Sequence, residues 1–464
     1  MCVHEHIFCR CSSRIEESRV SLFGHRAYRR LFTAQVSALC GTGLATVALG
    51  LLAYQLAGGD AGLVLGTALA VKMVVYVSVA PIAAAYADRL PRRALLVALD
   101  LVRVAVALSL PFVTEVWQVY LSVAVLQTAS AVFTPAFQAA LPDILPDERD
   151  YTRALSASQL AATMETLLSP LLAALLLTVL DFHRLFAGTA LGFLASAALV
   201  AGTAIPDAAP RAVTGIWDRT AAGMRIFAAT PRLRGLLGVN LAVAAAGSVV
   251  MVNTVNYVRD VQGGSSSDVA VLLAANGFGT MGAALVLPAV LDRIRDRAIV
   301  LAGAAALALG TVAAIFLARD DTGGRVGALA VWALIGAGTG LAITPVGRIL
   351  RRSARPADRP ALFAAQFSLS HLCWLLTYPI AGGLATSVGF ATTWIVLAVL
   401  AGTGLIAAVR YWPRHDPAAL GHVHDERVDP DHLRDAVPVG AHTYRHTHAF
   451  VIDDNHRRWP TPVG

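Results

Sequence analysis

Apolar runs, each long enough to cross a membrane, recur along almost the whole of this 464-residue chain. The hydrocarbon core of a bilayer is about 30 Å thick, and about 20 helical residues are needed to cross it. Only 14% of the residues are charged, against about 25% in an average soluble protein. A transmembrane β-barrel would show short alternating segments instead. The pattern therefore predicts an all-α polytopic membrane protein.

Twelve helical spans are expected, six in each half of the chain. Short connectors such as "AGGDAG" and "TEVW" place neighbouring helices antiparallel and side by side. The expected limits of the spans are 31–57, 62–86, 94–114, 116–140, 155–180, 184–205, 236–258, 268–290, 298–318, 326–348, 362–386 and 391–412. The resulting units are an N-terminal tail (1–30), a first bundle (31–205), a connector (206–235), a second bundle (236–412) and a histidine-rich tail (413–464).

Arginine is concentrated in alternate connectors. Arginine-rich loops mark the cytoplasmic side of a membrane protein, so we expect both termini in the cytoplasm and the protein in the plasma membrane. The formal charge of +7 follows from this arrangement and does not indicate a nucleic-acid partner. Within the long connector, "WDRTAAGMRIFAA" is predicted to form a helix on the inner surface. The arginine-rich connectors are 88–93, 146–153, 211–234, 292–297 and 347–359.

The two halves repeat one turn. "ADRLPRRALLV" follows the second span, and "LDRIRDRAIVL" follows the eighth. A parallel repeat of this kind predicts two pseudo-symmetric bundles with a binding site between them. Simple anchoring by positive charge would explain the arginines of the turn but not the repeated aspartate.

The first of these turns resembles the signature of the major facilitator superfamily, roughly G-x-x-x-D-R-x-G-R-R. The resemblance implies a fold of two six-helix bundles and a loop whose charges gate the cytoplasmic side. Asp100 and Arg103, three residues apart on one helix face, are interpreted as a mostly structural pair joined to this network. The matching residues of the first turn are Asp88, Arg89, Arg92 and Arg93, and those of the second turn are Asp292, Arg293 and Arg297.

A second stretch, "FTPAFQAALPDILPDERDYTRALSASQ", resembles the branch that contains the enterobactin exporter and macrolide-efflux proteins. This resemblance implies a monomeric, proton-coupled exporter of amphipathic small molecules, such as a drug or a siderophore, that works by alternating access without a cofactor. In "METLLSPLLAALLL", Pro170 matches the exporter motif while other residues stand at its glycine positions. The alternative is a non-transporting membrane sensor that uses the histidine-rich tail. Neither is an enzyme.

Lys72 is the only lysine among 37 lysine and arginine residues, and it lies near the middle of the second span. Glu165 lies similarly deep in the fifth span. Because a charge inside a bilayer is costly unless it is paired or hydrated, we expect Lys72 and Glu165 to interact or to share a water-filled cavity. In the functional interpretation Glu165 takes up protons, while Lys72 tunes it or contacts an anionic substrate. The alternatives are a structural ion pair and a lysine that reaches outward to the interface.

Other polar and aromatic side chains within the spans are candidates for contact with the substrate. His371 would titrate near neutral pH, although a histidine satisfied by a neighbouring helix fits the sequence equally well. The candidates are Tyr76, Gln127, Asn253, Asn256 and His371.

Three local patterns are assigned no ligand. "GFGTMG" matches a dinucleotide fingerprint but lies inside a span, where close packing of helices by small residues is expected. The N-terminal "CVHEHIFCRC" has ligand-like spacing without a supporting fold. The tail over 413–464 holds eight of the thirteen histidines at irregular spacing and without cysteine. We therefore expect a solvated tail and no metal site.

Overall fold

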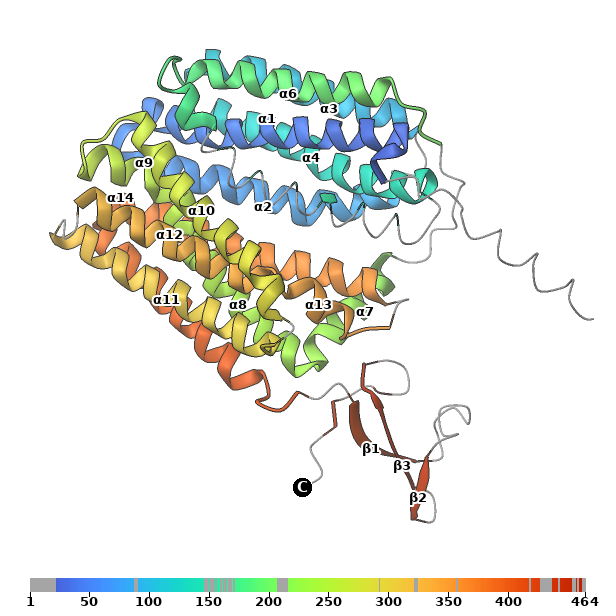
Figure 1. Ribbon diagram of the computed structural model, residues 1–464. Coiled ribbons are helices and arrows are strands. Elements are labelled where there is room, and N and C mark those ends of the chain that lie inside the picture. The colour runs from blue at the N-terminus through green and yellow to red at the C-terminus, as the bar shows by residue number, and fades with distance from the viewer. Residues whose placement is uncertain are drawn as a thin grey trace, which may run out of the picture.

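A computed structural model describes most of the chain (Figure 1). The described residues are 22–86, 91–145, 150, 154, 157–158, 161, 165, 169, 172–206, 216–291, 293–320, 324–355, 358–416, 419–425, 436–440, 443–452, 456 and 459–460. Asp88, Arg89 and Asp292 of the two predicted gating turns lie outside them.

The described part of the first half is helical. Its elements are η1 (Leu22–Gly24), α1 (Arg26–Ala57), η2 (Gly58–Asp60), α2 (Ala61–Tyr86), α3 (Arg92–Ser109), η4 (Leu110–Phe112), α4 (Val116–Ile144) and α6 (His183–Ala201). Isolated helical residues at 161, 165 and 169 and the helical stretch 172–176 fall within the expected fifth span.

The second half is also helical up to residue 411. Its elements are α7 (Ile216–Ala229), α8 (Pro231–Ser248), η5 (Val249–Asn253), α9 (Thr254–Asn256), η6 (Tyr257–Val261), α10 (Ser266–Leu291), α11 (Asp296–Asp320), α12 (Gly324–Ile343), α13 (Val346–Arg351) and α14 (Arg359–Tyr411). Both η5 and η6 are π-helical turns. The predicted helix in the long connector is confirmed as α7, which packs at Gly223 against Ala361 of α14.

Nine stretches of the described residues are long and apolar enough to cross a membrane. Two of them, of 54 and 51 residues, are far too long for a single crossing at 1.5 Å per residue. The first runs through the turn at Gly58, where φ is 53°, and the second through Gly389, where φ is 80°. Each therefore supplies two crossings, as expected for spans 31–57 with 62–86 and 362–386 with 391–412. The prediction of an all-helical polytopic membrane fold is confirmed.

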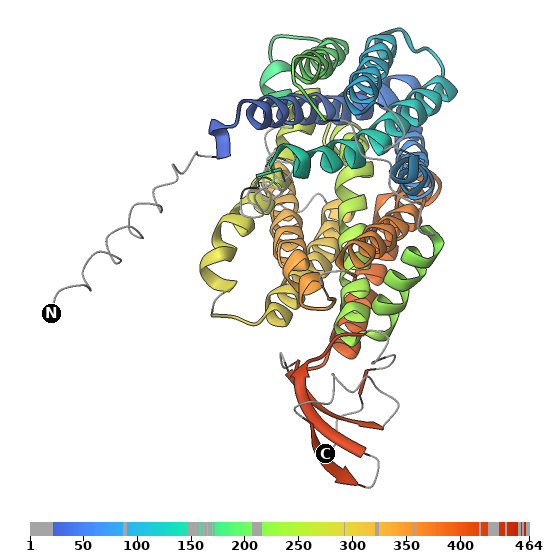
Figure 2. The same cartoon turned by 90° about the vertical axis from the view of Figure 1, so that its right-hand side faces the viewer.

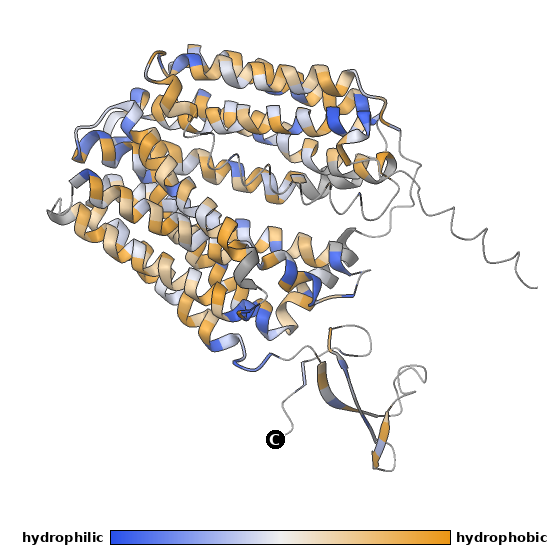
Figure 3. Ribbon diagram, in the orientation of Figure 1, coloured by the Kyte–Doolittle hydropathy of each residue, from blue (hydrophilic) through white to orange (hydrophobic). Residues whose placement is uncertain are grey.

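The helices gather into two groups that meet along α2 and α14 (Figures 1 and 2). In the first half, α6 packs against α1 and α3; in the second, α8 packs against α14, while α12 packs against α10 and α11. Large apolar side chains such as Phe112 and Val326 are about four-fifths exposed, at 81% and 77%. Apolar residues colour the helices along most of their length (Figure 3). Such surfaces suit contact with lipid.

Small residues let α10 and α12 approach closely. A Cβ atom added at Gly279 would lie 2.0 Å from the carbonyl oxygen of Ala333, and one added at Gly336 would lie 1.9 Å from that of Asn276. No side chain fits in either place. The prediction that "GFGTMG" serves helix packing is therefore confirmed.

The C-terminal tail contains a sheet that the sequence did not predict. Its antiparallel strands β1 (Ala419–Asp425), β2 (Val437–Gly440) and β3 (Thr443–Ala449) lie in the order β1-β3-β2. Beyond β3, Phe450 and Ile452 are buried, at 4% and 1% exposure. The expectation of a solvated tail is thus wrong for these residues. Strand β1 alternates histidine with other residues, and histidine is not counted as apolar in a periodicity analysis, so its buried face was not recognised.

Candidate functional site

Backbone contact joins the two halves where α2 meets the first part of α14. A Cβ atom at Gly382 would lie 2.3 Å from the carbonyl oxygen of Gly62, and one at Gly66 would lie 2.7 Å from that of Tyr378. Glycine is required at these positions because the two helices nearly touch. The helices thereby fix the side chains that follow along α2 relative to those on α14.

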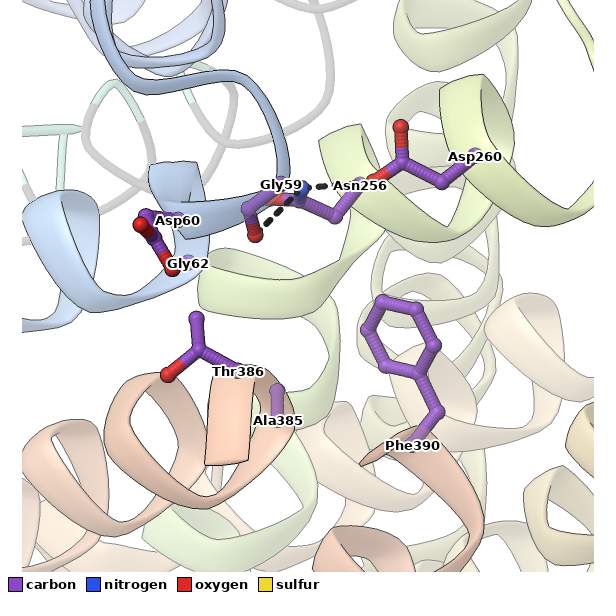
Figure 4. A pocket seen from close by; sticks show the side chains of 8 residues that line it. All are labelled: Gly59, Asp60, Gly62, Asn256, Asp260, Ala385, Thr386 and Phe390. Atoms are coloured by element: carbon purple, nitrogen blue, oxygen red, sulfur yellow. Dashed lines mark hydrogen bonds between the residues drawn. The ribbon is translucent and has the colours of Figure 1, made fainter. Parts of the chain in front are cut away.

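A polar network closes one end of this interface, which we call the Tyr54 end. The Tyr54 hydroxyl donates a hydrogen bond to Asp260 at 2.6 Å, and the Asn256 amide donates to the other oxygen of the same carboxylate at 2.8 Å. The Asn256 amide also donates to the carbonyl oxygens of Gly58 and Gly59, at 3.1 and 3.2 Å. Residues of both halves are thus tied together (Figure 4).

A cavity of about 230 Å³ lies beside this network. The Asn256 oxygen in its wall is buried and has no hydrogen-bond partner among the described residues. Figure 4 shows its lining residues, Gly59, Asp60, Gly62, Asn256, Asp260, Ala385, Thr386 and Phe390.

Of the two predicted asparagines, only Asn256 reaches the cavity. Asn253 is fully buried, donates to the carbonyl oxygen of Ala381 at 2.9 Å and accepts from the Trp394 indole at 3.1 Å. The Asn253 amide therefore makes its hydrogen bonds to α14, within the second half. Tyr54 and Asp260 were missed, since Asp260 reads as an ordinary connector residue and its partner lies 206 residues away.

The second polar group surrounds Lys72. The Lys72 ammonium lies 5.8 Å from the centre of the Tyr76 ring, and that ring stacks on His371 of α14 at 5.7 Å. His371 in turn stacks on Phe367 at 3.9 Å, and its Nδ1 lies 2.7 Å from the Phe367 carbonyl oxygen. Three of the predicted residues, from both halves, therefore meet here.

Glu165 belongs to the same electrostatic environment. Its carboxylate interacts through its charge with Lys72, and also with Tyr76 and Cys40. His371 in turn interacts with the charge of Lys72. The structure thus places Glu165 within electrostatic range of Lys72 and Tyr76, and Lys72 within range of His371, inside the expected spans.

The fifth span lies close to α1 at this level. A Cβ atom at Gly43 would overlap the Ser169 hydroxyl, at 1.8 Å, and would lie 3.5 Å from Cγ of Glu165. Ser169 stands at one of the glycine positions of the exporter motif. The fifth span and α1 still approach each other closely, because Gly43 of α1 provides the space that a glycine at position 169 would otherwise provide.

Asp100 and Arg103 form the expected ion pair on α3 and are 0% and 4% exposed. Asp100 also accepts a hydrogen bond from the Ser196 hydroxyl of α6 at 2.8 Å. The Arg103 guanidinium lies over the Phe133 ring of α4 at 4.2 Å and over Phe193 of α6 at 4.7 Å. The pair therefore joins three helices within the first half.

The described residues of the predicted gating turns differ in exposure. Arg92 is buried, while Arg93 and Arg293 are exposed. Arg297 donates to the carbonyl oxygen of Trp412 at 3.1 Å, near the end of α14. Gln127 of α4 is buried, at 8% exposure.

Asp296, in the first turn of α11, pairs with Arg348 of α13. Asp292 in the same "DRIRDR" turn is the predicted gating residue, and the carboxylate of Asp296 was missed. A carboxylate at a helix N-terminus is also favoured by the helix dipole.

The chain matches the sequence model described as Major Facilitator Superfamily over residues 31–320 and 236–439, which is most of its length. It therefore belongs to the major facilitator superfamily, as the signature turn predicted. It is a multi-pass membrane protein and a secondary transporter of small molecules, and not an enzyme.

Similar proteins support the same assignment. The uncharacterized MFS-type transporter YfiS of Bacillus subtilis (strain 168) is 26% identical over 336 residues, which cover 69% of this chain and 78% of that protein. Among solved structures, a variant of the nucleoside transporter NupG has a TM-score of 0.67 at 15% identity, covering 83% of this chain and all of the other. The D-xylose-proton symporter has a TM-score of 0.65 at 14% identity, covering 83% and 97%. At such identities the structures show a shared fold alone.

Proposed function

We propose that this transporter is a proton-coupled exporter of amphipathic small molecules. The observation that carries the proposal is the meeting of Lys72, Tyr76, Glu165 and His371 where the two halves of the chain face each other. Charged side chains within membrane spans serve transport pathways and proton relays by default. A sensor without transport needs neither these charges nor a duplicated fold.

Glu165 is the proposed proton carrier. Protonation removes its negative charge and so changes the environment of Lys72, with which it interacts. The ionised carboxylate would bind a basic or hydrogen-bond-donating group of a substrate, and protonation of Glu165 would release that group, while Lys72 tunes the carboxylate. Exchange of a proton for a substrate follows because the two compete for one carboxylate.

Aromatic side chains beside Lys72 favour an amphipathic substrate. Tyr76, His371 and Phe367 form a continuous stack, and Trp374 packs on Tyr378 at 4.9 Å further along α14. Such rings bind an apolar or aromatic body, while the ionised Glu165 beside Lys72 binds a basic or polar end. Export, rather than uptake, and the choice of a drug or a siderophore rest on the resemblance of residues 133–159 to the enterobactin-exporter and macrolide-efflux branch.

The Tyr54 end is proposed to be the extracellular gate, with both termini in the cytoplasm. This follows from the arginine-rich connectors at the opposite ends of the spans. Alternating access would then require the bonds from Tyr54 and Asn256 to Asp260 to break each time the outer side opens.

The decisive experiment is transport in inverted vesicles from a strain that lacks its own exporters. Macrolides, tetracyclines and siderophores are tested as substrates, with and without a proton gradient. We expect gradient-dependent accumulation of at least one of them, its loss in Glu165→Gln, and its retention in the matched control Glu115→Gln at the exposed start of α4. Accumulation by Glu165→Gln at the level of the unmodified protein would refute the role given to Glu165.

A further inference from the structure

Three histidines of the C-terminal tail converge on one point. His422 lies in β1, His448 in β3, and His456 follows seven residues after the end of β3. One ring nitrogen from each lies within 4.8 Å of the others, and Nε2 of His422 lies 3.0 Å from Nε2 of His456. His422 and His456 are 5% and 4% exposed. Three imidazoles so close together, two of them buried and one half-buried, are arranged as a ligand set.

The sheet fixes this arrangement. Strand β1 pairs with β3 so that Leu420 stands opposite His448. Residues two apart on a strand share a face, so His422 and His448 share one face of the sheet. The Phe450 ring lies 4.9 Å from the His422 ring and 4.6 Å from the His456 ring. An aromatic wall therefore borders the three imidazoles and limits their rotation.

The chemistry of the cluster suits a divalent transition metal. Imidazole nitrogen binds zinc at about 2.0–2.1 Å, and tetrahedral geometry then separates two ligand nitrogens by about 3.4 Å. The observed 3.0 Å between the two Nε2 atoms is within a few tenths of an ångström of that value. Nδ1 of His422 lies 3.0 Å from the carbonyl oxygen of Leu420. A metal-binding histidine almost always donates its second ring N–H to such an acceptor, which directs the other nitrogen at the metal.

We propose that His422, His448 and His456 form a binding site for a divalent transition metal such as Zn²⁺, with water at the fourth position. This site is independent of the proposed transport function. It also departs from our expectation that the tail binds no metal. The site could not be recognised from the irregular spacing of the tail histidines. The fold brings His448 and His456, which lie 26 and 34 residues after His422 in the sequence, next to it.

Occupancy of the site would hold the end of the chain against the second half. Trp459, three residues after His456, packs on Phe450 at 5.1 Å and lies under the Arg232 guanidinium of α8, also at 5.1 Å. Arg232 in turn pairs with Asp416 at 2.8 Å. The metal would therefore link the sheet to the segment that Arg232 contacts, and would favour docking of the tail on the bundle.

The test uses the full-length protein in detergent, purified without a polyhistidine tag and treated with a chelator. Zn²⁺ is titrated in competition with a chromophoric chelator. We expect one tight equivalent of Zn²⁺. Loss of an outer-shell partner already lowers metal affinity about 10–100-fold, so His422→Ala or His456→Ala should lower it by at least about 100-fold. The matched control, His415→Ala at an exposed position before β1, should bind like the unmodified protein.

Two further measurements decide the matter if the variants fold poorly. X-ray absorption at the zinc edge of the unmodified protein should show nitrogen and oxygen ligands with about three imidazoles. A variant with Cys9 and Cys11 both changed to Ser should retain the tight equivalent. Sulfur in the coordination shell, loss of binding in the cysteine variant, or equal weakening by His415→Ala would each overturn the proposal. So would the absence of a tight equivalent in the unmodified protein.

Discussion

The carboxylate of Asp260 accepts a hydrogen bond from the Tyr54 hydroxyl at 2.6 Å, which joins the first span to the seventh across 206 residues of sequence. The same carboxylate accepts from Asn256, so a single acidic side chain organises the closed end of the interface between the halves. Its neighbour Arg259 lies over the Tyr54 ring at 5.4 Å. The hydrogen bond from Tyr54 to Asp260 therefore stabilises the closed state, and a single substitution of Tyr54 can remove it.

Tyr54→Phe should favour opening at this end. The change keeps the ring and removes the donor, and a hydrogen bond of this kind contributes about 1 kcal/mol net. The ratio of closed to open molecules should therefore fall about five-fold. Labelling of a cysteine placed at Thr386, in the cavity wall, measures the shift. The control is Tyr411→Phe, at an exposed position near the end of α14, and equal labelling of all three proteins would contradict the gating role.

Replacement of both Lys72 and Glu165 should lower the thermal stability less than replacement of either residue alone. Each single change, Lys72→Met or Glu165→Gln, leaves one charge in the membrane without its counterpart, which typically costs about 3–5 kcal/mol, whereas removal of both can be nearly neutral. Thermal unfolding in detergent measures this difference. Strictly additive losses would show that the two residues do not interact.

The same double variant distinguishes a structural role of the Lys72–Glu165 pair from a role in proton-coupled transport. If Glu165 carries the coupling proton, the protein with both replacements should fold but should not accumulate substrate against its gradient. Recovery of transport together with stability would instead assign the pair a structural role. We expect stability without transport.

Asp100→Asn should destabilise the first half strongly. The amide still fits beside Ser196, but Arg103 is left as a buried cation without its counter-charge, at a cost of about 3–5 kcal/mol. The unfolding temperature should fall clearly in this variant and hardly at all in Asp181→Asn, whose side chain is exposed. A shift as small as that of Asp181→Asn would mean that Arg103 is stabilised by its two aromatic neighbours alone.

Single-cysteine labelling should place the two ends of the helices on opposite sides of the membrane. In a protein without native cysteines, Thr114→Cys is expected to react from outside the cell and Ile294→Cys only after permeabilisation. Both positions are exposed at helix ends. Reaction of both from the same side would contradict the predicted orientation.

The helical fold could be predicted from sequence because a bilayer allows few solutions. Backbone groups in lipid must be bonded within a helix or a closed barrel, so long apolar runs specify the spans directly. The ion pair of Asp100 with Arg103 could also be predicted, since residues three apart on a helix lie on the same face. Both predictions depend only on residues that are close together in the sequence.

Long-range contacts could not be predicted in the same way. Nothing near Asp260 in the sequence indicates Tyr54, because their contact depends on how two bundles dock. The tail was misinterpreted for a related reason. His422 and His456 are 34 residues apart and meet only through the pairing of β1 with β3 and the return of the chain beyond it.

The contact between Trp459 and the buried Arg232 of α8 bears on how the protein is made. Domains generally fold as units during synthesis, beginning from the N-terminus. Here the membrane helices of the second half are complete at residue 411, yet Trp459, whose ring contacts the Arg232 guanidinium, is translated well after them. The surroundings of this buried cation are therefore completed only after the helices have been made. A premature stop codon before Trp459 would release a protein in which Arg232 lacks its aromatic neighbour.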